Sequence, residues 1–281
     1  MIQTKIIHSI PILRIINNNR EQNEWKVSCS KPILKNYLNN TLISGEKYHG
    51  IKAPLNYGEV KKSAKVDNKI LIYKYVKNII PNQFIDCKVD HTKLKFNSRG
   101  IKYKGIQAKK VVFCEGFHNI VNPFFNYLPL IGSKGEMLII KCDHLISEVI
   151  FKGPIFLSPI GEKKFWVGAT FDRDDKTTSI TKKGKEWLRS KLEKFLILPY
   201  QIIEHKSQIR ATVIDRRPIL GIHPLNNKLF ILNGMGTRGV LMAPLLSQWL
   251  YEYIENQSKL PELSNIYISI DISLIFSIST L

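Results

Sequence analysis

Cysteine is scarce in this chain of 281 residues, and its spacing excludes two kinds of site. The four cysteines, Cys29, Cys87, Cys114 and Cys142, lie far apart and form no C-x-x-C pair. Structural zinc sites and disulfide scaffolds use closely spaced cysteines. The sequence therefore predicts reduced thiols that are mostly buried.

Long apolar runs are also missing. No uninterrupted run reaches the roughly 20 residues that a membrane-spanning helix needs, and the chain starts without a charged-then-apolar leader. No Ser/His/Asp or zinc-ligand pattern emerges, which argues against hydrolase chemistry. With 44% hydrophobic and 23% charged residues, the composition is ordinary for a soluble globular protein. We expect a cytoplasmic protein of one or two domains with no membrane partner.

Acidic residues are few compared with basic ones, 23 against 42, and the formal net charge is +19. Clustered basic residues neutralise phosphates, so this charge raises a nucleic-acid hypothesis. However, 33 of the 42 are lysine, and along the sequence they are scattered rather than grouped with aromatic residues. Abundant Lys, Ile and Asn are also what A/T-rich codons encode. On charge alone, nucleic-acid binding is the less favoured interpretation.

Extended and helical patterns are interleaved along the chain. Helical periodicity predicts helices over 64–78 and 181–195, the second opened by a Thr-x-x-Gly sequence. The tail over 266–280 alternates apolar residues with serine, which favours a strand. Alternating or apolar runs predict further extended segments at 6–16, 25–28, 83–88, 93–96, 107–114, 132–141, 149–158 and 163–170, and again from residue 201.

The segment "LNGMGTRGVLMAP" at 232–244 has the Gly-x-Gly-x-x-Gly spacing of a dinucleotide-binding loop. A short buried strand is predicted before it at 228–232 and a helix after it at 245–254. The fingerprint also needs a second strand with an acid about 20 residues further on. Asp271 follows Gly239 by 32 residues and lies within a predicted strand. The pattern match is therefore incidental, and the loop needs another explanation.

Five motifs in a fixed order suggest that explanation: "VVFCEG" (111–116), "LPLIGSKGEML" (128–138), "IFLSPIGEKKFWVGAT" (155–170), "QIRATVIDRRPILG" (208–221) and "LFILNGMGTRGVLMAP" (229–244). Together they resemble the D-amino-acid oxidase and glycine oxidase superfamily of FAD-dependent oxidoreductases. "DRRP" followed by "GTRG" is most similar to the oxidoreductase domain of the bifunctional enzyme that modifies tRNA wobble uridine. The similarity extends over about residues 1–258.

The resemblance implies an α/β (α+β) fold in which an incomplete FAD-binding Rossmann-like domain is interleaved with an antiparallel-sheet substrate domain. Family members begin with a βαβ unit bearing a true dinucleotide fingerprint. Nothing of that kind precedes Ile10. We expect a family member without that unit: an incompletely predicted gene, a split protein whose N-terminal half is another chain, or a decayed remnant. The expected boundaries are 1–58 and 132–212 for the substrate domain, 59–131 and 213–260 for the FAD domain, and 261–281 for a tail.

The implied activity is oxidation of the C–N bond of a small-molecule amine or amino acid with FAD as cofactor. Arg210 would grip the substrate carboxylate through two parallel hydrogen bonds, and Arg216, Arg217 and Arg238 are further candidates to face an anion. Gly116 would allow close approach to the pyrophosphate or ribose. The residues expected to face the flavin ring are Gly234, Met235, Gly236, Thr237, Arg238, Gly239 and Val240.

Two alternatives stay open. The first is a tRNA-modifying FAD oxidase that acts on carboxymethylaminomethyl uridine, with tRNA as a partner. The second is a non-catalytic remnant or a partner subunit.

Overall fold

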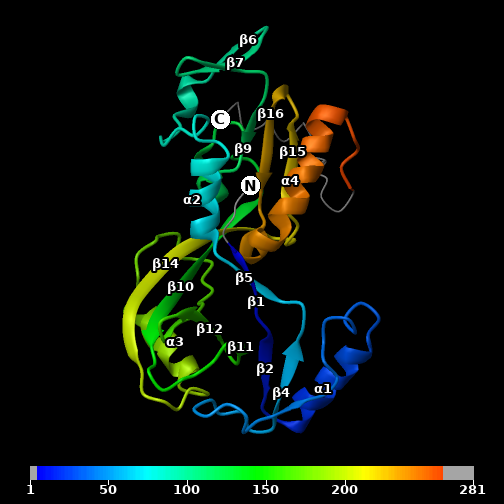
Figure 1. Ribbon diagram of the computed structural model, residues 1–281. Coiled ribbons are helices and arrows are strands. Elements are labelled where there is room, and N and C mark those ends of the chain that lie inside the picture. Colours follow the sequence, from blue (N-terminus) through cyan, green and yellow to red (C-terminus); the bar gives the residue numbers. More distant parts are fainter. Residues whose placement is uncertain (1–4, 262–281) are drawn as a thin grey trace. The chain divides into compact units, whose positions relative to one another are not determined.

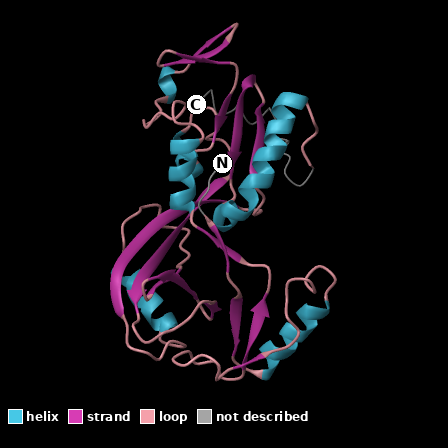
Figure 2. Cartoon of the chain, in the orientation of Figure 1, coloured by secondary structure: helices cyan, strands magenta, loops and turns pink. Residues whose placement is uncertain are grey.

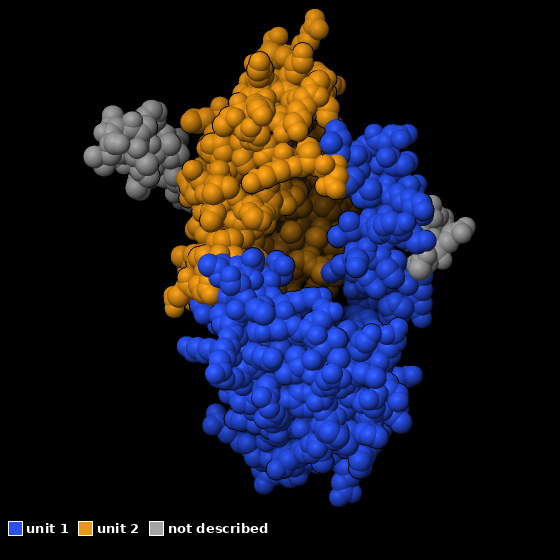
Figure 3. All heavy atoms as spheres, turned by 90° about the vertical axis from the view of Figure 1, so that its left-hand side faces the viewer, with its two compact units in different colours: residues 1–85, 134–172, 177–208 blue, residues 86–133, 173–176, 209–281 orange. Residues whose placement is uncertain are grey.

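The computed structural model describes residues 5–261, which fold into two compact units, coloured separately in Figure 3. Unit 1 comprises residues 1–85, 134–172 and 177–208, and unit 2 comprises residues 86–133, 173–176 and 209–281. Each unit is assembled from separate segments, so the chain passes between them several times. Across residues 5–261, no helix combines the length and the apolar character needed to cross a membrane.

A mixed sheet of eight strands forms the centre of unit 1 (Figures 1 and 2), in the order β14-β10-β13-β12-β11-β2-β4-β3. The first residues of β10 (130–133) and the last residues of β14 (209–213) belong to unit 2. Strand β2 runs parallel to β11, whereas β10–β13, β13–β12, β12–β11 and β2–β4 are antiparallel. The sheet confirms the extended segments expected at 132–141 and 163–170, whereas the run expected at 149–158 is divided between the antiparallel strands β11 and β12. The strand bounds are β2 (Ile12–Ile16), β3 (Ile43–Ser44), β4 (Asn56–Val60), β10 (Leu130–Lys141), β11 (Ile150–Lys152), β12 (Phe156–Gly161), β13 (Lys164–Gly168) and β14 (Gln201–Val213).

Helix α1 (Asn19–Ser30) shows that the extended segment expected at 25–28 is wrong. The Asn18 side chain caps this helix by accepting a hydrogen bond from the Glu21 amide at 3.0 Å. Trp25 and Cys29, four residues apart, bury the same face of the helix. The cap and the helical spacing outweigh an alternation that covers only four residues.

The structure of region 64–88 agrees only in part with the elements that its sequence predicts. Residues 64–78 contain strand β5 (Ala64–Val66), which pairs with β1 (Ile7–Ser9), and helix α2 (Asn68–Asn78) begins after its cap Asp67. The strand expected at 83–88 is not formed. Phe84 and Ile85 are 50% and 58% exposed, so the apolar alternation there does not mark a buried sheet face.

Helix α3 (Lys182–Leu192) begins as its sequence predicts. The Thr181 hydroxyl accepts from the Gly184 amide at 2.9 Å and donates to Glu136 Oε1 at 2.7 Å. Because Glu136 lies on β10, this pair of bonds attaches the start of the helix to the sheet. Leu188 and Leu192 are fully buried in the core of unit 1, and they attach the rest of the helix.

Unit 2 is built on a three-stranded sheet, β15-β16-β9, with helix α4 (Gly239–Asn256) alongside it in Figure 1. Strand β16 (Asn226–Asn233) is parallel to β9 (Val111–Phe113) and antiparallel to β15 (Ile219–His223). Its alternate residues enter two cores, Leu229 and Ile231 on one face and Phe230 and Leu232 on the other. A strand buried on both faces has a continuous apolar sequence, and for this reason β16 could be predicted from the sequence.

The remaining elements of unit 2 are short. The run expected at 107–114 is divided between β8 and β9, and the helix expected at 245–254 begins earlier, at Gly239. The strand expected at 266–280 lies outside the described residues. The short elements are η1 (His91–Lys93), β6 (Lys95–Asn97), β7 (Gly100–Tyr103), β8 (Ile106–Ala108), η2 (Gly116–Val121) and η3 (Gly236–Arg238).

Candidate functional site

The loop between β16 and α4 uses glycine for two physical reasons. Gly234 and Gly236 have φ angles of +70° and +56°, a conformation that other residues rarely adopt. A Cβ on Gly234 would lie 3.0 Å from Ile219 Cγ1 and 3.2 Å from the Ile219 nitrogen. The first glycine therefore also permits close packing against β15.

Asn233 joins this loop to the one that follows the neighbouring parallel strand. It is 3% exposed, its Nδ2 donates to the Gly116 carbonyl at 2.8 Å, and its Oδ1 accepts from the Gly234 amide at 2.8 Å. The loops after β9 and β16 are thereby held side by side. Our sequence analysis did not select Asn233, although a polar residue that ends an apolar strand directly before a glycine is a usable signal.

Gly116, the first residue of η2 after β9, leaves open space beside its Cα. Its φ is +57°, and apart from Gly116 itself and its two chain neighbours no heavy atom lies within 4 Å of the position that a Cβ would take. The preceding Glu115 is engaged by its neighbours, because His91 Nε2 lies 2.7 Å from Oε1 and Asn122 Nδ2 donates to Oε2 at 2.7 Å. These contacts fix the Glu115 carboxylate, and the space beside the Gly116 Cα stays open.

The N-terminal ends of η3 and α4 carry no side-chain cap and no acidic residue in the first turn. The first amides of a helix have no partner within the helix, and the helix dipole places partial positive charge there. Thr237, Arg238 and Val240 are exposed at this end, while Met235 packs against the core and Gly239 is half-buried. Such an end can accept the electron-rich polar edge of a planar ring.

Arg210 lies near this loop, at the C-terminal part of β14. Residues two apart in a strand share a face, so Arg210 and Thr212 point to the same side of β14. A Cβ on Gly236 would lie 3.2 Å from Thr212 Cγ2, which places this face of the strand against the glycine loop. Arg210 is half-buried, and this burial lowers the pKa of its guanidinium. A cation partly withdrawn from water attracts an anion more strongly.

The turn at 215–217 is tied to the same loop. Asp215 Oδ1 accepts from the Arg217 amide at 3.0 Å, and Arg216 adopts a left-handed φ of 61°. Arg238 Nη2 donates to the Arg216 carbonyl at 2.6 Å. The structure thus joins Arg238 to the backbone of Arg216, and the side chains of Arg216 and Arg217 are exposed. Gly116, the glycine loop, Arg210 and this turn all belong to unit 2.

Comparisons with known proteins identify the family and the fold of the chain. Residues 82–253 match the family model described as FAD dependent oxidoreductase. The chain is 27% identical over 170 residues to the tRNA 5-methylaminomethyl-2-thiouridine biosynthesis bifunctional protein MnmC of Marinobacter nauticus. That match covers 55% of this chain and 27% of the relative, so the chain spans about a quarter of the relative's length.

Two solved glycine oxidases have a similar fold. The Geobacillus kaustophilus structure matches with a TM-score of 0.74 at 16% identity, over 95% of this chain and 78% of that one. The Bacillus cereus structure matches with a TM-score of 0.72 at 15% identity, over 90% and 74%. The family match covers more than half of the chain, including β9, Gly116, Arg210 and the glycine loop. The chain therefore belongs to the family of FAD-dependent oxidoreductases.

Proposed function

We propose that the protein oxidises the C–N bond of a small amine or amino acid that carries a carboxylate, with FAD as the cofactor. The observation that carries this proposal is the position of Arg210, on the face of β14 that contacts the glycine loop at Gly236. The open backbone at Gly116 and the uncapped N-terminus of α4 fit FAD. The glycine oxidases of similar fold act, by their names, on an amino acid.

The residues of this chain would bind and orient the reactants. FAD, when bound, supplies the two-electron acceptor for the hydrogen that leaves the carbon next to nitrogen. Arg210 would hold the carboxylate by two parallel hydrogen bonds and so fix that carbon relative to the loop. The positive end of α4 would stabilise negative charge that develops on the polar edge of the ring. No protein nucleophile is needed, so the tasks of these residues are orientation and charge complementation.

A substrate panel tests this function. The FAD-loaded protein should oxidise one or more small amino acids, such as glycine, with release of an imine that hydrolyses to ammonia. The corresponding amides keep the amine but lack the carboxylate, so they should react far more slowly. Ammonia release is the measurement. If no amine in the panel reacts, the result favours the non-catalytic interpretation. Equal rates for acids and amides would contradict the role proposed for Arg210.

A second candidate function is oxidation of a modified uridine in tRNA. The support for it is the relative from Marinobacter nauticus, whose name refers to tRNA 5-methylaminomethyl-2-thiouridine biosynthesis, together with the net charge of +19. The carboxymethylaminomethyl uridine of this hypothesis also places a carboxylate beside an amine. Binding of tRNA that weakens steeply with salt supports this candidate. Binding that is absent or independent of salt favours the free amino acid as substrate.

We further propose that a strand–turn–helix unit holds the dinucleotide end of FAD by pairing with β9. Among the described strands, β9 has a neighbour on one side only. An apolar pocket of about 400 Å³ lies beside it, lined partly by Leu94, Ile101, Ile106 and Val112. The test is to measure FAD affinity before and after addition of such a unit as a separate polypeptide. Equal affinities would contradict this arrangement.

A further inference from the structure

Helix α3 presents two different polar flanks. On one flank, Lys182 Nζ lies 3.9 Å from Glu186 Oε1, and Arg189 Nη2 donates to Glu193 Oε1 at 3.3 Å. Both acidic residues of this segment are therefore paired with cations on the same side of the helix. The positive charge of that flank is largely neutralised.

The opposite flank carries Lys183, Trp187, Lys191 and Lys194, which we call the basic stripe. The spacing of four residues places Lys183, Trp187 and Lys191 in one row along the helix. Lys194 follows in the turn directly after the helix ends. Within residues 5–261, none of the three lysines forms an ion pair with an acid. Trp187 is 40% exposed, and Lys191 Nζ lies 5.4 Å from its ring centre. The winding of the helix thus brings together lysines and an aromatic ring that are scattered along the linear sequence.

The basic stripe is held rigidly. The opposite side of α3 is buried through Leu188 and Leu192, and Thr181 attaches the start of the helix to Glu136 on β10. Little conformational entropy of the backbone would therefore be lost when a ligand binds along the helix.

The chemistry of the stripe fits RNA better than a lipid surface. A helix that lies on a membrane inserts a broad apolar face, whereas Trp187 is the one large apolar side chain that α3 exposes in the structure described for residues 5–261. A single aromatic ring between cations suits one stacked base with phosphates on either side. Charge complementarity makes a polyanion the matching partner.

We propose that the basic stripe binds a single-stranded or looped segment of RNA, with a base stacked on Trp187 and phosphates contacting Lys183, Lys191 and Lys194. This inference rests on the second candidate function, action on tRNA, and names the surface that would contact the nucleic acid. Lys191 already lies over the indole, so a stacked base would displace it toward a neighbouring phosphate.

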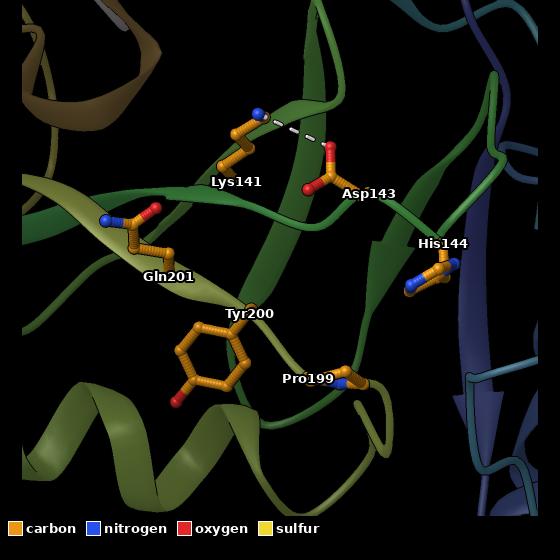
Figure 4. Close-up of a pocket in the computed structure, with 6 residues that line it drawn as sticks. All are labelled: Lys141, Asp143, His144, Pro199, Tyr200 and Gln201. Carbon is orange, nitrogen blue, oxygen red and sulfur yellow. Dashed lines mark ion pairs between the residues drawn. The ribbon is translucent and has the colours of Figure 1, made fainter.

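A hollow at the end of β10 and the start of β14 provides a contrast (Figure 4). It has a volume of about 220 Å³, and the hydroxyl of Tyr200, one of its lining residues, donates to Glu193 Oε1 at 3.0 Å. Tyr200 thereby contacts the flank of α3 that carries the acidic residues. The lysine of the hollow is neutralised, because Lys141 Nζ lies 3.5 Å from Asp143 Oδ1. The lining residues are Lys141, Asp143, His144, Pro199, Tyr200 and Gln201.

The first test compares two triple variants of equal charge. The probe is a fluorescein-labelled single-stranded RNA of about 12 nucleotides, long enough for one such surface, and the measurement is fluorescence anisotropy. Lys183→Gln/Lys191→Gln/Lys194→Gln should weaken binding at least tenfold and reduce the slope of log K against log salt by about 2, as expected for three lost phosphate contacts. Lys182→Gln/Lys185→Gln/Arg189→Gln removes the same charge from the other flank and should weaken binding less than threefold. Equal losses in the two variants would overturn the inference and leave tRNA action possible.

The second test isolates the ring. Trp187→Leu keeps apolar bulk but cannot stack, so RNA affinity should fall about fivefold or more, whereas Trp187→Phe should keep most of it. Unchanged affinity in Trp187→Leu overturns the stacking, and circular dichroism checks that each variant is folded.

Vesicles of phosphatidylserine and phosphatidylcholine are the competing partner. If the protein binds these vesicles more tightly than RNA, and the triple variant of the basic stripe loses that binding, the inference is also overturned. If the unaltered protein binds no RNA, both this inference and the tRNA candidate fail, whereas amine oxidation is measured independently.

Discussion

Asn233 and Gly116, which are 117 residues apart, are joined by a hydrogen bond of 2.8 Å from the amide side chain to the backbone carbonyl. This bond connects the ends of two adjacent parallel strands, β9 and β16. The carboxyl ends of parallel strands are where ligands bind in α/β sheets. The pair therefore fixes the relative position of the two loops that we assign to the cofactor.

Replacement of Asn233 should destabilise the protein. Asn233→Ala leaves the Gly116 carbonyl and the Gly234 amide without their partner in a buried position, at a cost of about 1–3 kcal/mol in the free energy of unfolding. Urea denaturation measures this change. Asn227→Ala, at the exposed start of the same strand, is the control and should change stability by less than about 0.5 kcal/mol. Equal effects of the two substitutions would contradict the role given to Asn233.

Two glycine substitutions separate backbone strain from cofactor contact. Gly116 and Gly105 both have a left-handed φ, +57° and +85°, and in both a new Cβ would meet no atom within 4 Å. Gly116→Ala and Gly105→Ala should therefore cost similar stability, about 1 kcal/mol each. Only Gly116→Ala should weaken FAD binding, because the methyl group would occupy space that we assign to the cofactor. Fluorescence titration with FAD measures the affinity, and an equal affinity in both variants would exclude Gly116 from the site.

His223 should make stability depend on pH. The ring packs against Phe125 at 5.3 Å, and Nδ1 accepts from the Leu225 amide at 3.1 Å, which requires that nitrogen to be unprotonated. Burial lowers the pKa of His223 below its ordinary value. The unfolded chain therefore binds the proton more readily, so this contribution to stability is complete above about pH 6.5 and is lost as the pH falls below it.

The variant His223→Phe tests this dependence. Unfolding free energies measured from about pH 7.5 to 5 should fall less steeply with acid in the variant than in the unaltered protein, because the unfavourable protonation is removed. If the two curves stay parallel over this range, the imidazole is not held in its neutral form by burial.

The predictable parts of the structure are those with local causes. Strand β16 and the loop that follows could be predicted because a run of apolar residues ends at glycines with left-handed φ. The N-terminal cap of α3 could also be predicted, since Thr181 and Gly184 are three residues apart. Helix α1 was missed because a four-residue alternation was given more weight than the cap at Asn18.

Contacts between distant residues were not accessible from sequence patterns. The bond between Asn233 and Gly116 depends on the parallel pairing of β9 and β16, which no local pattern specifies. The closeness of Thr212 to Gly236 likewise depends on how β14 ends against the loop. Recognising the basic stripe requires knowing which residues of α3 lie on the same side of the helix. A shift of one residue in that assignment would mix its lysines with the acidic residues of the other flank.

The central claim is that Arg210 binds the substrate carboxylate beside the flavin, and anaerobic reduction of the flavin by an amino acid tests it most directly. The FAD-loaded protein is mixed with increasing concentrations of a substrate identified in the panel, and the rate at which the visible flavin absorbance is lost is recorded. In Arg210→Lys the amino acid concentration that gives half of the maximal reduction rate should rise about 10- to 150-fold with FAD still bound, because an ammonium cannot form the paired contact. Arg216→Lys, in the exposed turn that Arg238 contacts, should change it much less. Equal effects in the two variants, or loss of FAD from Arg210→Lys, would contradict the account.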